Sequence, residues 1–245
     1  MKKTKGVWGG GLLLLTTCLA GCEVAEVFPN AEPRERKITD NYEYYEYVPA
    51  AKKTDLLLEN FYDNRRGWRV VSYSSTTQYS TRIVDGDLEI DNRASSPQQN
   101  SIDFPELKGT DNFEIETWIR LIYSNGAYVG NGNGLLWGLK AAAPGQWLYY
   151  GIHDNYSKMA VGAYDGQRYQ VENPLTSRLQ TPFYQGGYNT FMVRKVNNTC
   201  YYFLNGELLT KQTAAPFYGS RIGFGADAYS TVRVGFLRVS RLNLN

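Results

Sequence analysis

The stretch of sequence that decides the fold is Asn112-Phe113-Glu114-Ile115-Glu116-Thr117-Trp118-Ile119-Arg120-Leu121. Apolar and polar residues alternate along it with a period of two, which is typical of a β-strand with one buried face. The alternation assigns Phe113, Ile115, Ile119 and Leu121 to a core face, and Glu114, Glu116, Trp118 and Arg120 to the opposite face. This segment is therefore expected to cross a sheet whose two faces have different chemistry.

Segments on either side of this stretch show the same period. Residues 87–91 alternate in sequence, and residues 188–196 offer Phe191 and Val193 to a core while Met192 and Arg194 face away. Short alternating runs recur every 8–12 residues with Gly, Asn and Asp between them, a spacing typical of a β-sandwich or jelly roll. Helical signals are almost absent, because the run of alanines at 141–143 is short and ends at a proline.

Three dipeptides predict tight hairpin turns. Asn205-Gly206 separates two strand-like runs, and Asp85-Gly86 and Asp165-Gly166 occupy equivalent places in theirs. Asn-Gly and Asp-Gly favour type I′ turns because both residues tolerate positive φ. The sequence thus predicts an all-β protein, a jelly-roll β-sandwich of two antiparallel sheets with about a dozen strands, over residues 55–245.

The N-terminus has the layout of a secretory signal peptide. Three lysines precede an apolar stretch that is too short to span a bilayer, and Leu19-Ala20-Gly21-Cys22 follows. This run is similar to a bacterial lipobox, although an ordinary secretory signal could also end in cysteine. The resemblance implies removal of residues 1–21, acylation of Cys22, and attachment to the membrane through that lipid. Glu23, in place of Asp, favours the outer membrane of a Gram-negative bacterium, with the side of the membrane left open.

Residues 22–54 are expected to form a tether between the lipid and the folded domain. They combine prolines and charges with the run Tyr42-Glu43-Tyr44-Tyr45-Glu46-Tyr47, and they show neither strand nor helix periodicity. Loss of residues 1–21 removes three lysines and no acid, so the formal net charge falls from +2 to −1. Such a charge gives no electrostatic reason to expect a nucleic-acid partner.

Cysteine and histidine chemistry is sparse. Once Cys18 leaves with the signal and Cys22 is acylated, Cys200 remains in a strand-like run, where a buried structural thiol is expected. His153 is the only histidine, so histidine-rich metal sites are excluded. We expect neither a cofactor nor a metal site.

An ordered set of short motifs resembles the laminin-G-like branch of the concanavalin A-like lectin/glucanase superfamily. The motifs are those at 63–68, 85–90, 112–116, 134–138, 149–152, 193–195, 203–206, 221–225 and 236–239. The resemblance covers about residues 55–242 and implies two stacked, curved antiparallel sheets. Because members of the superfamily bind glycans, bind proteins or hydrolyse sugars, it implies no single function.

The sequence favours binding over catalysis. Retaining glycosidases need two carboxylates close together, and Glu89-Ile90-Asp91 and Glu114-Ile115-Glu116 are the nearest candidates. Neither has the third acid of the glucanase motif, so ordinary strand acids facing solvent explain them better. The twenty Tyr, ten Phe and five Trp suit stacking on sugar rings or burial in protein interfaces, although sheets favour aromatics in any case.

We therefore expect a lipid-anchored, non-catalytic module of the cell envelope that recognises carbohydrate. Two alternatives remain, a glycoside hydrolase and a structural accessory of an outer-membrane protein complex. The expected ligand-binding residues are Trp118 and Arg194, with Trp137, Tyr150 and His153 placed nearby by the family resemblance. The alternative explanation for Trp118 and Arg194 is a solvent-facing cross-strand cluster that only stabilises the sheet.

Overall fold

The computed structural model describes residues 47–124, 132–140, 145–153, 158–175, 183–184 and 186–244. These residues contain one short 3-10 turn, η1 (Ala50–Lys52), and fourteen strands. The strands are β1 (Lys53–Glu59), β2 (Tyr79–Val84), β3 (Asp87–Asn92), β4 (Gln98–Asp103), β5 (Phe113–Ser124), β6 (Asn133–Lys140), β7 (Gln146–His153), β8 (Lys158–Tyr164), β9 (Tyr169–Leu175), β10 (Asn189–Val196), β11 (Thr199–Leu204), β12 (Glu207–Thr213), β13 (Arg221–Ala226) and β14 (Ser230–Leu242).

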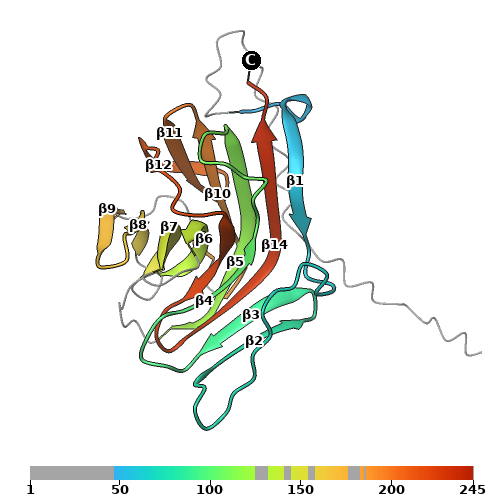
Figure 1. Ribbon diagram of the computed structural model, residues 1–245, viewed down its shortest axis with the longest axis vertical. Coiled ribbons are helices and arrows are strands. Elements are labelled where there is room, and N and C mark those ends of the chain that lie inside the picture. Colours follow the sequence, from blue (N-terminus) through green and yellow to red (C-terminus); the bar gives the residue numbers. More distant parts are fainter. Residues whose placement is uncertain are drawn as a thin grey trace, which may run out of the picture. The chain divides into compact units, whose positions relative to one another are not determined.

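The strands form two antiparallel sheets, which confirms the predicted fold class (Figure 1). The large sheet has the order β12-β11-β10-β5-β14-β3-β2, and the small sheet has the order β4-β13-β6-β7-β8-β9. β14 pairs with β5 along one edge, while β3 pairs with the beginning of its other edge and β1 with the end. The paired strands β5 and β14 thus lie at the centre of the large sheet, and their outward side chains line its outer face along the length of both strands.

The core lies between the sheets and follows the predicted alternation. On β5, Phe113, Ile115 and Ile119 are completely buried, as is Thr117 on the same face, while Glu116 and Trp118 on the other face are only partly buried. The small sheet contributes residues such as Leu135 and Phe224 to the same core. A second, smaller apolar cluster lies on the other face of β6, β7 and β8, and consists of Leu136, Leu139, Trp147, Tyr149 and Ala160.

Many of the aromatic side chains that the sequence suggested for ligand recognition are buried in the interior. The largest fully buried side chains include Trp68, Trp137, Tyr149, Tyr150, Phe61, Phe113, Phe191 and Phe224. The exposed large side chains are instead mostly tyrosines, namely Tyr47, Tyr62, Tyr73, Tyr123, Tyr184, Tyr188 and Tyr229. The large aromatic side chains that are exposed among the described residues are therefore tyrosines.

Two of the three predicted hairpin turns are confirmed. Positive φ angles occur at both Asp85 and Gly86 between β2 and β3, and at both Asn205 and Gly206 between β11 and β12. The third prediction, Asp165-Gly166, is wrong in type, because only Gly166 has a positive φ there and four residues connect β8 to β9. The Asp165 carboxylate accepts hydrogen bonds from the backbone N–H groups of the next residues, and this interaction shapes the longer turn.

The described fold begins before the predicted boundary at residue 55. β1 starts at Lys53, and Val48 is already buried. Residues 1–46, which include the signal, Cys22 and most of the predicted tether, lie outside the described residues. Among those that are described, no helix has the length and apolar character needed to cross a bilayer.

Cys200 is buried, as predicted for a structural thiol. Burial raises the pKa of its thiol to about 11, so the thiol remains protonated and unreactive at neutral pH.

Candidate functional site

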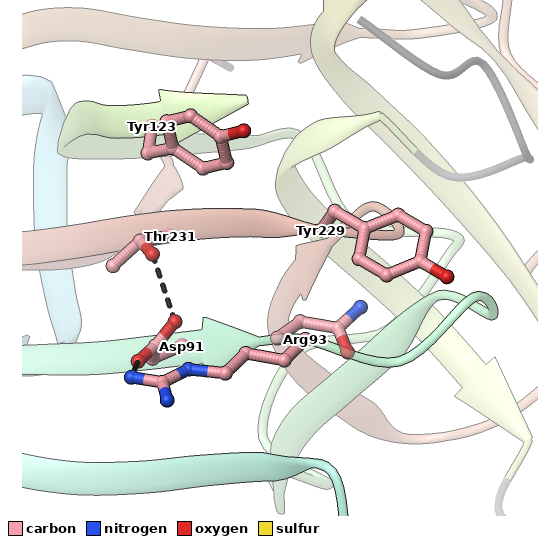
Figure 2. Close-up of a pocket in the computed structure, with 6 residues that line it drawn as sticks. Asp91, Arg93, Tyr123, Tyr229 and Thr231 are labelled. Carbon is pink, nitrogen blue, oxygen red and sulfur yellow. Dashed lines mark hydrogen bonds and ion pairs between the residues drawn. The ribbon is translucent and has the colours of Figure 1, made fainter. Parts of the chain in front are cut away.

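A cavity of about 430 Å³ opens where β3 and β5 end and β14 begins. Six residues line it: Asp91, Asn92, Arg93, Tyr123, Tyr229 and Thr231. Thr231 lies opposite Asp91 on β3 and opposite Tyr123 on β5, so their side chains share one face. That face is the outer one, because the neighbouring Ile90 and Val232 point into the core. We call this cavity the tyrosine pocket (Figure 2).

A network of polar contacts fixes Asp91 in the floor of the tyrosine pocket. The Thr231 hydroxyl donates to Asp91 Oδ1 at 2.9 Å, and an Arg93 nitrogen lies 3.2 Å from Asp91 Oδ2. The Arg93 guanidinium also lies 4.4 Å from the centre of the Tyr73 ring. The Tyr73 hydroxyl in turn donates to the main-chain carbonyl of Asp91. Figure 2 shows Asp91 held between Thr231 and Arg93.

The electrostatics of the tyrosine pocket keep Asp91 ionised. Burial raises the pKa of Asp91, but the hydroxyls of Tyr73 and Thr231 and the charge of Arg93 outweigh it and hold the pKa below its usual value. A carboxylate in this state accepts hydrogen bonds and does not donate a proton. The floor of the pocket is therefore an acceptor beside a guanidinium donor.

Two exposed tyrosine rings lie beside this polar floor. Tyr123 is 56% exposed and Tyr229 is 42% exposed. Tyr229 has a φ of 53°, in the left-handed region that bulky side chains rarely adopt, and its N–H donates to the Ala94 carbonyl. Backbone strain of this kind persists where the surroundings enforce it, and it clusters at ligand sites.

Asn92 supplies the surroundings that enforce this conformation. Its side-chain amide donates to the carbonyls of Ala226, the last residue of β13, and Asp227, the first residue of the β13–β14 turn. Its carbonyl oxygen accepts from the Ala94 N–H. One buried side chain therefore ties together the two chain segments that carry Arg93 and Tyr229.

The turn between β13 and β14 also carries a buried carboxyl group, that of Asp227. It is 2% exposed, and its N–H donates to Asn133 on β6. Burial raises the pKa of Asp227 to about 7, so the turn beside the tyrosine pocket carries a titrating carboxyl near neutral pH.

The structure does not bring together the four sequence-predicted ligand residues whose side chains it describes. Trp118 and Arg194 do point away from the core, as the alternation indicated. Trp118 packs on Phe236 of β14, with ring centres 5.0 Å apart. Arg194, however, is only 4% exposed, and both its Nε and a terminal nitrogen contact Glu114 Oε2. Alternation predicted the face of the sheet on which Arg194 lies, but it did not predict that the Glu114 carboxylate would pair with Arg194 there.

Trp137 and Tyr150 require a correction. They are 1% and 0% exposed and lie in the core between the sheets, where a ligand cannot reach them in this structure. The Tyr150 hydroxyl donates to the Phe203 carbonyl at 3.1 Å. Both residues occupy inward positions of strands whose two faces are apolar, so period two could not assign their direction. His153 ends β7, and its side chain lies outside the described part of the chain.

The two acid pairs considered for catalysis are engaged in ion pairs. Glu114 contacts Arg194 and Lys53, and Glu116 contacts Arg238. Glu89 contacts Arg82 and Arg233. Glu89 and Glu114 are buried, not the solvent-facing strand acids that the sequence suggested. Of these acids only Asp91 lines the tyrosine pocket.

Sequence reasoning missed Tyr123, Tyr229 and Thr231. Tyr123 lies beyond a register shift between β5 and β14, where strict period two stops predicting the face. Tyr229 belongs to a turn, and turns carry no periodicity. The sequence signal for the pocket was the spacing of Glu89 and Asp91. Two residues apart on one strand, both acids lie on the outer face of β3, beside β14.

Comparison with known proteins supports the fold and nothing finer. No family model and no curated protein sequence matches the chain. Domain 4 of an extracellular arabinanase from Geobacillus stearothermophilus, solved in complex with arabinotriose, has a TM-score of 0.50 at 10% identity, over 78% of this chain and 94% of that one. The CBM2 module of the evolved Dit of Lactobacillus casei BL23 phage J-1 has a TM-score of 0.49 at 14% identity, over 79% and 98%. The carbohydrate-binding module CBM66 from Bacillus subtilis has a TM-score of 0.42 at 13% identity, over 76% and 93%.

Proposed function

We propose that this domain is a non-catalytic carbohydrate-binding module and that the tyrosine pocket is its glycan site. The observation that carries the proposal is the placement of two exposed tyrosine rings beside an ionised carboxylate and a guanidinium. Ring faces stack on the apolar faces of sugars, and the charged pair offers an acceptor and donors to sugar hydroxyl groups. The fold of the arabinanase domain, solved with arabinotriose, is compatible with this use.

The chemistry of the pocket favours binding over hydrolysis. Glycosidases use two carboxyl groups, one of which has a raised pKa so that it can donate a proton. Asp91 is the one carboxyl among the described residues that line the tyrosine pocket, and its pKa is lowered. A carboxylate held by Thr231 and Arg93 is suited to accepting hydrogen bonds from a ligand.

A glycan array followed by calorimetry tests the proposal. Wild-type protein should bind at least one oligosaccharide without releasing sugar, and Tyr229→Ala should weaken that binding about tenfold or more. Tyr62→Ala is the matched control, because Tyr62 is 81% exposed and lies outside the pocket. The proposal fails if no glycan binds, if sugar is released, or if Tyr229→Ala and Tyr62→Ala bind alike.

We further propose that the module is anchored to the outer membrane by a lipid on Cys22. The support is the sequence Leu19-Ala20-Gly21-Cys22 after a short apolar stretch. Cys22→Ser should block acylation and leave uncleaved precursor, measured by mass and by fractionation of the membranes. Normal maturation and membrane attachment of Cys22→Ser would contradict the proposal.

A further inference from the structure

Two arginines lie side by side next to the tyrosine pocket. Arg233 follows Thr231 by two residues on β14, so it lies about 7 Å further along the same face. Arg120 of β5 is directly opposite Arg233 in the register of the two strands. Like charges placed opposite each other destabilise a sheet unless an anion compensates them.

The acids of the region are already engaged elsewhere. Glu89 Oε2 accepts from Arg233 Nε at 2.7 Å, while Glu89 Oε1 lies 2.6 Å from a nitrogen of Arg82. Asp87 Oδ2 accepts the Tyr188 hydroxyl at 2.5 Å and is 3.8 Å from Arg233. Both carboxylates therefore make their direct contacts with groups other than Arg120, whose charge acts on Asp87 only through space.

Arg120 has no directly bonded carboxylate, although burial raises the pKa of the nearby Asp87 and the charge of Arg120 acts to lower it. No hydrogen bond or salt bridge joins it to any residue that the structure describes, and its guanidinium lies 6.0 Å from the centre of the Tyr188 ring. Its Nε atom is buried without a hydrogen-bond partner. A buried N–H without a partner is costly, and a bound anion is one arrangement that would satisfy it.

We propose that Arg120 and Arg233 bind the carboxylate of an acidic sugar residue, in a glycan whose neighbouring residue occupies the tyrosine pocket. This inference rests on the proposed function and narrows its ligand to a uronate-containing oligosaccharide. Guanidinium groups bind carboxylates through paired hydrogen bonds, and the partly exposed Tyr188 ring offers an apolar face beside them. Trp118 and Phe236 follow on the same face, where the ligand can continue.

The test uses oligosaccharides of galacturonate and of mannuronate, each compared with its carboxyl-reduced counterpart by calorimetry on the mature protein. The acidic form of at least one pair should bind about tenfold more tightly than the reduced form. Arg120→Gln should abolish that preference while the affinity for the reduced form stays the same. Arg82→Gln is the matched control, since it removes the same charge from the far side of Glu89 and should keep the preference.

The results distinguish the acidic-ligand inference from the proposal that the tyrosine pocket binds a glycan. Equal affinities within every pair, or a preference that survives in Arg120→Gln, overturn the acidic-ligand inference but leave the pocket proposal intact. Failure of every uronate oligosaccharide to bind also overturns the inference, while neutral glycans on the array still test the pocket. Tyr229→Ala should weaken both members of a pair equally, because it acts on the neighbouring sugar residue.

Discussion

Tyr229, in the tyrosine pocket, holds a backbone conformation that side chains rarely adopt. Its φ of 53° is strained for any side chain except glycine. We predict that Tyr229→Gly is more stable than Tyr229→Ala by roughly 1 kcal/mol, because alanine keeps the strain and glycine relieves it. Both variants should lose glycan binding equally, because both lack the ring. Urea denaturation measures the first difference and calorimetry the second, and equal stabilities would mean that the conformation is not strained.

Asp227 makes a prediction about pH. Burial raises the pKa of Asp227 from its ordinary value of 3.8 to about 7, so the folded state retains a proton that the unfolded state releases. The stability that this proton contributes is complete below about pH 4 and is lost as the pH rises through 7. Relative to Asp227→Asn, the wild type should therefore weaken by a few kcal/mol between these values.

Thermal unfolding of both proteins across that pH window checks the Asp227 prediction. A constant stability difference between wild type and Asp227→Asn would contradict it. Asp91→Asn is the contrasting variant, because the pKa of Asp91 is lowered. The Asp91 carboxylate stabilises the fold above its ordinary pKa, and this contribution is lost as the pH falls through the lowered value. Relative to Asp91→Asn, the wild type should therefore gain stability as the pH rises, which is the opposite of the trend expected relative to Asp227→Asn.

At the scale of elements, the turn between β11 and β12 gives a clean test of backbone conformation. Gly206 has a φ of 84°, and no atom lies within 4 Å of where a Cβ would stand. Gly206→Ala should therefore cost about 1 kcal/mol from conformation alone, without a steric clash. Gly67→Ala is a matched comparison at a φ of 72° with equally open space, and should cost a similar amount. Urea denaturation of the two variants measures both costs, and an unchanged stability of Gly206→Ala would contradict the assigned turn.

The strands also show which features the sequence could predict. On β5 the residues from Phe113 to Leu121 that alternation assigns to the core are buried as expected, because that face meets the small sheet. β6 and β7 are buried on both faces, so Trp137 and Tyr150 could not be assigned a direction from alternation. The tyrosine pocket depends on the register of β3, β5 and β14, and these strands are distant in sequence. A single sequence contains no signal for that register.

For the whole molecule, β1 determines where the domain begins. Leu57 is 1% exposed, and Lys53 Nζ lies 2.5 Å from Glu114 Oε1. The Glu59 carboxylate accepts from the Phe61 N–H and from Trp68 Nε1 at 3.1 Å. These contacts fasten the first strand to the core, so we propose that the folded domain starts near residue 47 and not at residue 55.

Truncation tests this boundary and its relation to the glycan site. A chain that starts at residue 47 should melt at the same temperature as the mature protein. One that starts at residue 60 loses the buried Leu57 and leaves Trp68 Nε1 without its acceptor, and should lose at least about 3 kcal/mol, or roughly 10 °C. Glycan binding by the shorter chain, measured below its melting temperature, should nevertheless persist. The reason is that β1 pairs with Leu237–Leu242, whereas the tyrosine pocket is built at Tyr229 and Thr231, toward the other end of β14. Loss of binding with no loss of stability would instead show that the two ends of β14 are coupled.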